Sequence, residues 1–246
     1  MRILIALAAV LLAPLAASAQ SLSEMERDEV RQIIREYLLE NPELIEEAVI
    51  ELQYRRDQER TEANRAAIAS LAPRLYDDPR DFKVGPADAP VQIVEFFDYN
   101  CPYCRSSTPW VKELLERHPE QVRFIFKEAP IFADTRESSA IAAQAAIASI
   151  EHDLYLDLHF ALMDASGTLP VSQVRALAEE SGLNWRRAES VMESPETAQQ
   201  LVDGLDLLDA IGATGTPAFI VNGELVPGAD FEQLDELVEA ALAATE

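Results

Sequence analysis

Two cysteines, Cys101 and Cys104, are the residues of this chain whose type and spacing most directly indicate chemistry. They are its only cysteines, and Pro102 and Tyr103 separate them. Such a C-x-x-C pair is compatible with half of a zinc site, a structural disulfide or a redox-active dithiol. Zinc needs four ligands, and a disulfide closing so short a loop removes little chain entropy. We therefore favour the dithiol and expect no metal and no cofactor.

The elements expected around the pair support this interpretation. The β-branched and aromatic run Val91–Phe97 predicts a buried strand that leads directly to the cysteines. A helix is expected after them, followed by a second strand over residues 121–131, which together form a parallel βαβ unit. At a helix N-terminus, unpaired N–H groups and the helix dipole stabilise a thiolate. The sequence thus predicts Cys101 as the nucleophile with a lowered pKa, and Cys104 as the resolving thiol.

The rest of the chain predicts further helices and a second β segment. A Pro- and Asp-rich connector covers residues 74–90 and includes a short edge strand at 81–84. Residues 136–203 show only helical patterns. Asn222-Gly223 then separates two apolar runs, which is a strong hairpin signal, and an amphipathic helix closes the chain.

The first residues indicate export. Residues 1–19 contain one basic residue, a short apolar run and an Ala-Ser-Ala cleavage site, the pattern of a secretory signal peptide. A membrane anchor is the alternative, but the apolar run is shorter than the ~20 residues that cross a bilayer. We expect the mature protein to be released without membrane insertion.

Residues 20–73 predict a helical extension that ends at Pro73. Apolar residues recur at helical spacing in two segments separated by Asn41-Pro42. A short amphipathic helix cannot bury its apolar face alone. The extension is therefore either an arm that folds back on its own domain or an oligomerisation stalk, and we favour a homo-oligomer formed through residues 25–60.

The charge of the chain excludes one class of partner. There are 20 basic and 44 acidic residues, which gives a formal net charge of −24. Such a surface repels nucleic acid and anionic lipid. We expect no binding to nucleic acid.

Three stretches together resemble one family. VEFFDYNCPYC, FKEAPI and GATGTPAFIVNG, separated by a helical block, are similar to the DsbA-type thioredoxin-fold proteins of the bacterial periplasm. The resemblance implies an α/β thioredoxin-like fold in residues 74–246, with a helical domain inserted at about 134–204. It also implies a cis bond before Pro217, with Thr216 and Pro217 facing the cysteines. The alternative for Pro217 is an ordinary strand start.

Two charged residues, Glu95 and Lys127, lie within neighbouring predicted strands. Glu95 lies within an apolar strand, where a lone carboxylate is costly, and we place Lys127 at the matching position of the next strand. One alternative is that they form a buried ion pair. The other is that they adjust the pKa of Cys101 and help transfer the Cys104 proton.

The chain departs from the oxidase pattern of this family in two ways. Tyr103 stands where the oxidase prototype has a histidine that stabilises the thiolate, and Pro102 and Tyr103 are expected to tune the redox poise. The N-terminal extension is similar to the oligomerisation segment of ScsC-like proteins, some of which are trimeric isomerases linked to copper tolerance.

These features predict a periplasmic thiol–disulfide oxidoreductase with an isomerase or reductase preference. Its expected partners are unfolded or misfolded exported proteins and a membrane redox partner protein. The alternatives are a DsbA-type oxidase, a copper-binding protein that uses both thiolates, and a holdase chaperone that acts through its arm. Chaperone activity of this kind would persist after substitution of both cysteines.

Overall fold

A computed structural model of the chain describes residues 23–244. The expected signal peptide, residues 1–19, lies outside the described residues. The chain divides into two compact units, with the boundary between Arg56 and Asp57. Within residues 23–244, no helix has the length and apolar character that crossing a membrane requires.

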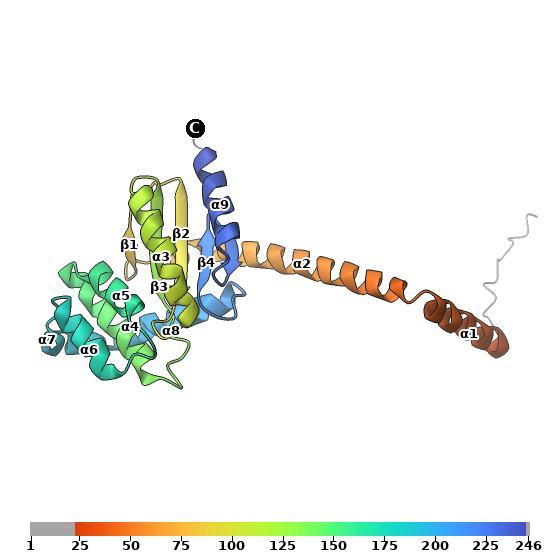
Figure 1. Ribbon diagram of the computed structural model, residues 1–246, viewed down its shortest axis with the longest axis horizontal. Helices are drawn as coiled ribbons and strands as arrows, with labels where there is room; N and C mark the ends of the chain where they lie inside the picture. The colour runs from red at the N-terminus through yellow and green to blue at the C-terminus, as the bar shows by residue number, and fades with distance from the viewer. Residues whose placement is uncertain (1–22, 245–246) are drawn as a thin grey trace, which may run out of the picture. The chain divides into compact units, whose positions relative to one another are not determined.

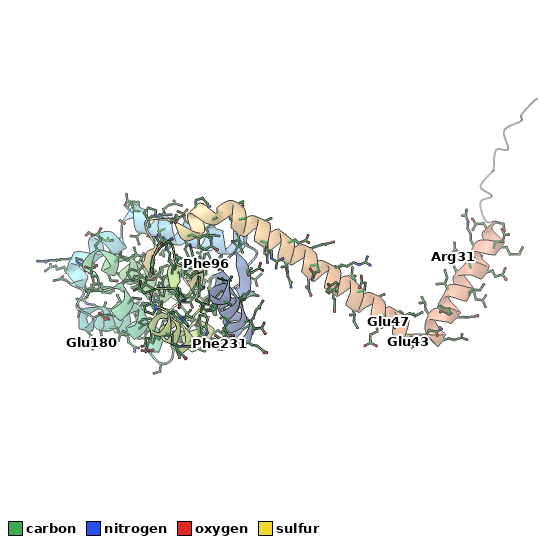
Figure 2. All side chains as sticks on the ribbon, turned by 90° about the horizontal axis from the view of Figure 1, so that it is seen from above. Arg31, Glu43, Glu47, Phe96, Glu180 and Phe231 are labelled. Carbon is green, nitrogen blue, oxygen red and sulfur yellow. The ribbon has the colours of Figure 1, made fainter. Side chains whose placement is uncertain are left out.

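The described part of the first unit is helical and leaves its apolar side chains uncovered. It contains α1, Glu24–Glu40, and the beginning of α2, Glu43–Tyr76. A capping box starts α1, because Ser23 and Glu26 each accept a hydrogen bond from the other's backbone N–H. The exposed large apolar residues of this unit are Met25, Val30, Ile33, Ile34, Tyr37, Leu39, Ile45, Val49, Ile50, Leu52 and Tyr54. Figure 2 shows side chains, Glu43 and Glu47 among them, projecting outward from these helices.

The end of α2 belongs to the second unit. Ile68 and Leu75 are 2% and 0% exposed and pack against Phe96 and other residues of one sheet face. Our expectation that Pro73 ends the helix is wrong, because Pro73 lies inside α2, which continues to Tyr76. Burial of Leu75 favours the helical turn that follows the proline.

A five-stranded sheet forms the centre of the second unit (Figure 1). Its strands are β1 Phe82–Val84, β2 Val91–Phe97, β3 Val122–Glu128, β4 Ala218–Val221 and β5 Glu224–Pro227. The order is β1-β3-β2-β4-β5, with β2 and β3 parallel and the other pairs antiparallel. Helix α3, Pro102–Arg117, connects the parallel pair, so the expected βαβ unit is confirmed. The expected hairpin is confirmed too, with positive φ at Asn222 and Gly223.

Helices cover both faces of this sheet. On one face, α3 and the last helix, α9 Phe231–Ala243, pack against Ile93, Phe97 and Phe219. The other face, which includes Val94 and Phe96, packs against α2 and α8. Figure 2 shows Phe96 among the packed side chains of this unit. The two faces follow from the alternation of side chains along each strand.

A helical block is inserted between β3 and β4. It contains α4 Glu137–Ser149, the short 3-10 helix Ile150–His152, α5 Tyr155–Asp164, α6 Val171–Glu180, α7 Trp185–Met192 and α8 Pro195–Ala210. The many small residues of α4 allow its neighbours to approach closely, and most of its alanines and serines are buried. The chain thus has an α/β thioredoxin-like fold with an inserted helical domain and an N-terminal helical extension.

Candidate active site

The two cysteines lie where the central strand β2 gives way to helix α3. Cys101 is the N-cap of α3, and Pro102 occupies the first helical position, which suits its fixed φ. Cys104 is one turn inside the helix. Both thiols are free, and Cys101 and Cys104 are 2% and 1% exposed. By contrast, Tyr103 between them is 68% exposed.

The loop before β4 brings Thr216 and Pro217 to Cys101. The Thr216–Pro217 peptide bond is cis, as expected from the family resemblance. The Cys101 Sγ lies 3.2 Å from the carbonyl oxygen of Thr216 and donates a hydrogen bond to it in the protonated form. The Thr216 hydroxyl is buried and has no hydrogen-bond partner among the described residues, which leaves it free to donate to a thiolate. Residues more than a hundred positions apart therefore form one site.

The environment of Cys101 favours its charged form. The pKa of Cys101 is lowered from 9.0 to about 6, and a hydrogen bond from the Cys104 thiol makes the largest contribution to this shift. Burial opposes this shift, whereas Thr216 and the backbone N–H groups of Cys104 and Tyr103 assist it. Because those N–H groups belong to the first turn of α3, the helix start supplies part of the stabilisation.

The environment of Cys104, in contrast, favours its neutral thiol form. Burial raises the pKa of its thiol well above the ordinary value, and the hydrogen bond to Cys101 raises it further. The pair therefore contains one thiolate and one thiol near neutral pH, which is the division of roles that nucleophilic attack and later resolution require.

Glu95 is a buried carboxyl group on the same face of the sheet as the site. It is 2% exposed, and its Oε1 accepts a hydrogen bond of 3.2 Å from the Ser107 hydroxyl. Burial raises the pKa of Glu95 from 4.5 to about 8, and the charge of Cys101 contributes in the same direction. Glu95 is therefore able to hold or accept a proton near neutral pH. Ser107 follows Cys104 by one helical turn, a spacing from which the sequence could have identified it.

Lys127 does not pair with Glu95. In the parallel register, Glu95 lies opposite Phe126, and Lys127 lies opposite Phe96. A difference of one residue directs a side chain to the other face of a sheet. There Lys127 binds the Asp81 carboxylate and the Arg74 carbonyl oxygen. The Glu95–Lys127 ion pair, one of the two alternatives for these residues, is thus absent, and Lys127 joins the end of α2 to the sheet.

A buried polar cluster holds the segment before Cys101 against the helical insert. Asp98 accepts hydrogen bonds from the backbone N–H groups of Asn100 and Phe132 and from the Ser139 hydroxyl. The Asn100 amide donates to Ser138 and Ser139. Sequence reasoning missed this cluster, since its members come together only when α4 packs beside the loop.

Metal ligands are not gathered in the described residues. Within residues 23–244, no three His, Cys, Asp or Glu side chains lie close enough together to hold a metal ion.

The lowered pKa of Cys101 predicts a pH profile of alkylation. In the reduced protein, we expect the rate of Cys101 modification by iodoacetamide to rise with pH around a midpoint of about 6. The reason is that only the thiolate reacts. Mass spectrometry of the stopped reaction assigns the modified residue. A midpoint at the ordinary value of 9.0 would show that the site does not stabilise the thiolate.

Two family models match this chain. The DSBA-like thioredoxin domain matches residues 92–240, and the Copper resistance protein ScsC N-terminal domain matches residues 26–59. The second match covers much of the segment in which apolar side chains are exposed on α1 and α2.

Curated relatives are similar over part of their length. A Na(+)/H(+) antiporter NhaA 1 of Salinispora arenicola is 31% identical over 170 residues, which are 69% of this chain and 26% of the relative. The chain thus spans about a quarter of the length of that relative. The Thiol:disulfide interchange protein DsbA of Bordetella pertussis is 27% identical over 145 residues, 56% of this chain and 67% of the relative.

A solved structure extends the similarity to almost the whole chain. It is a Proteus mirabilis ScsC variant with a deletion in its linker and one point substitution. It is 30% identical, covers 92% of this chain and 100% of its own, and superposes with a TM-score of 0.66. With its dithiol at the start of α3, its cis proline and these matches, the chain belongs to the DsbA-like thioredoxin family, a family of thiol–disulfide oxidoreductases, and carries an ScsC-type N-terminal segment.

Proposed function

We propose that this protein is a periplasmic thiol–disulfide oxidoreductase that acts on the disulfides of exported proteins through Cys101 and Cys104, with a preference for isomerisation or reduction. The observation that carries the proposal is the paired environment of the two sulfur atoms. A Cys101 thiolate with a pKa of about 6 sits beside cis-Pro217, with a protonated Cys104 behind it. The periplasmic location rests on the signal peptide expected at residues 1–19.

Reduction of a substrate disulfide takes two steps. The Cys101 thiolate attacks one substrate sulfur, forms a mixed disulfide and releases the other substrate sulfur as a thiolate, which takes up a proton. Cys104 then loses its proton. In the mixed disulfide Cys101 is uncharged and no longer raises the pKa of Glu95, and we propose that ionised Glu95 is the nearby base that accepts the proton. The Cys104 thiolate attacks Cys101 Sγ and releases the second substrate thiolate. Two electrons pass from the dithiol to the substrate.

Isomerisation uses the first step only. A different thiolate of the substrate attacks the mixed disulfide, forms a new substrate disulfide and returns the Cys101 thiolate. No net electrons are transferred, but the dithiol must be kept reduced between encounters. We propose that a membrane redox partner protein supplies those electrons.

The preference for isomerisation or reduction over oxidation rests on Tyr103. Its side chain is exposed and offers no cationic group to the thiolate, and the nearby hydrogen bonds come from Cys104, Thr216 and the backbone. A less stabilised thiolate makes the disulfide form less oxidising. Pro102 and Tyr103 thus set the redox poise through the helix start.

The exposed apolar side chains of α1 and the beginning of α2 support a homo-oligomer formed through residues 25–60. Helices of this kind gain stability by covering one another's apolar faces. Several active sites in one assembly would hold a misfolded chain at a high effective concentration while its bonds rearrange.

Reactivation of a scrambled-disulfide protein tests this function. We expect the mature chain from Gln20 to reactivate it, and we expect a truncation beginning at Asp57 to lose that activity. The truncation starts at the boundary between the units and keeps Ile68 and Leu75, which are buried in the second unit. It should still reduce a small peptide disulfide, because its active site is complete. The assembly state of both proteins is measured by light scattering.

One outcome of this experiment would contradict the proposed isomerase preference. If the mature chain only oxidises reduced substrate, and truncation changes nothing, the protein is a DsbA-type oxidase. The proposed isomerase preference is then wrong.

A further inference from the structure

A surface cleft with two positive charges adjoins the active site. It has a volume of about 390 Å³ and is lined by Asn100 and Pro102, by the loop at 165–168, and by Arg105 and Arg136. Pro102 lies between the cysteines, so a group held in this cleft lies beside a substrate attached to Cys101. Neither arginine has a role in the chemistry proposed above.

The two guanidinium groups contact backbone oxygens rather than carboxylates. Arg105 donates to the carbonyl oxygens of Tyr99 and Gly167, and Arg136 donates to that of Asn100 at 3.2 Å. In addition, Nη2 of Arg105 is buried and has no hydrogen-bond partner among the described residues. Leaving a buried charged donor unsatisfied is costly, so Arg105 keeps hydrogen-bonding capacity that its contacts within the protein do not use.

The balance of charge around the cleft favours an anion. Burial lowers the pKa of Arg105, the charges of Asp98 and Cys101 raise it, and the charge of Arg136 lowers it. Asp98 is the carboxylate that acts most strongly on Arg105, but its two oxygens already accept three hydrogen bonds. Once Cys101 is bonded to a substrate sulfur it carries no charge, so two cations then face one carboxylate whose oxygens are occupied, on a chain whose formal net charge is −24. Local positive potential of this kind attracts and orients negative groups.

We propose that this cleft binds a carboxylate of the disulfide substrate, an acidic side chain close to the reacting cysteine of a polypeptide. Guanidinium groups suit this role because they offer several N–H donors in the planar geometry that matches a carboxylate. The inference deepens the proposed function and rests on it, because it assigns a substrate preference to the same site. Glutathione disulfide carries carboxylates as well, and a separate arm of the experiment distinguishes it.

The test compares two peptide disulfides that differ only in Glu or Gln next to a cysteine. With the full mature chain at low salt, we expect kcat/KM to be about fivefold higher for the Glu peptide. Arg136→Gln should bring this ratio close to one, and Arg136→Lys should restore part of it. Arg187→Gln is the matched control, since Arg187 is an exposed arginine on α7 of the same helical insert. It should leave the ratio unchanged.

Two further measurements separate the possible failures. The Gln peptide reports the basal reaction: if it reacts and the Glu peptide is no faster, the cleft proposal is wrong while the proposed function stands. If neither peptide reacts, the proposed function fails. Fluorescence anisotropy of labelled Glu and Gln peptides on Cys101→Ala/Cys104→Ala protein then decides the cleft proposal, which predicts tighter binding of the Glu peptide.

The third arm uses glutathione disulfide and its ethyl ester. A preference for the free acid that disappears in Arg136→Gln, without any preference between the two peptides, would assign the cleft to a small disulfide and overturn the polypeptide proposal. Since exposed charges are screened by salt, the Glu preference should also shrink at high ionic strength.

Discussion

Cys101→Ser protein is expected to form no mixed disulfide with a substrate and to show no turnover above the buffer rate. Serine keeps the size of the side chain but removes the sulfur that must attack. Cys104→Ser, in contrast, should still attack and should accumulate the mixed disulfide, because the thiol that releases the substrate is missing. Non-reducing gels and mass spectrometry measure both species.

The contrast between the two variants is the decisive result. Both substitutions remove one buried sulfur atom at the start of α3, so each serves as the structural control for the other. Circular dichroism verifies that both are folded. A trapped mixed disulfide in Cys101→Ser instead of Cys104→Ser would reverse the assigned roles.

Glu95→Gln is expected to stabilise the reduced protein, and the gain should grow with pH. The folded-state pKa of Glu95 is raised from 4.5 to about 8 by burial. Between these values the native protein binds a proton that the unfolded chain has lost, so the wild type loses stability as pH rises through this window. Glutamine has no such dependence. The difference in free energy of unfolding should be small at pH 5 and reach about 3 kcal/mol near pH 7.

Urea unfolding at pH 5 and pH 7 measures this difference. A pH-independent difference would show that Glu95 is not a desolvated carboxyl group. The same variant should resolve its mixed disulfide at least about tenfold more slowly, because Cys104 loses its proton acceptor. Greater stability together with slower resolution would mean that the carboxyl group is kept for its chemistry at a cost in stability.

Much of the fold and of the sulfur chemistry could be predicted from the sequence. Val91–Phe97 and the C-x-x-C pair are local signals, and Asn222-Gly223 specifies its turn through two adjacent residues. These features depend on neighbouring positions in the chain, where periodicity and turn chemistry are directly visible.

Features that depend on register or on packing were not predictable in the same way. Glu95 and Lys127 both lie in apolar strands, but only the pairing of Val91 with Val122 reveals that they face opposite sides. Arg105 and Arg136 line one cleft only because the helical insert folds back on the start of α3. Pro73 is a strong helix-breaking signal that the burial of Ile68 and Leu75 overrides.

The position of Cys104 one turn behind Cys101 also bears on oxidative damage. A thiolate of low pKa reacts readily with peroxide and becomes a sulfenic acid, which further oxidant converts irreversibly to sulfinic acid. Here the neighbouring thiol can attack the sulfenic sulfur, expel water and leave the ordinary Cys101–Cys104 disulfide. A cellular reductant can reverse that product. The geometry that resolves substrates therefore also protects the nucleophile from permanent loss under oxidative stress.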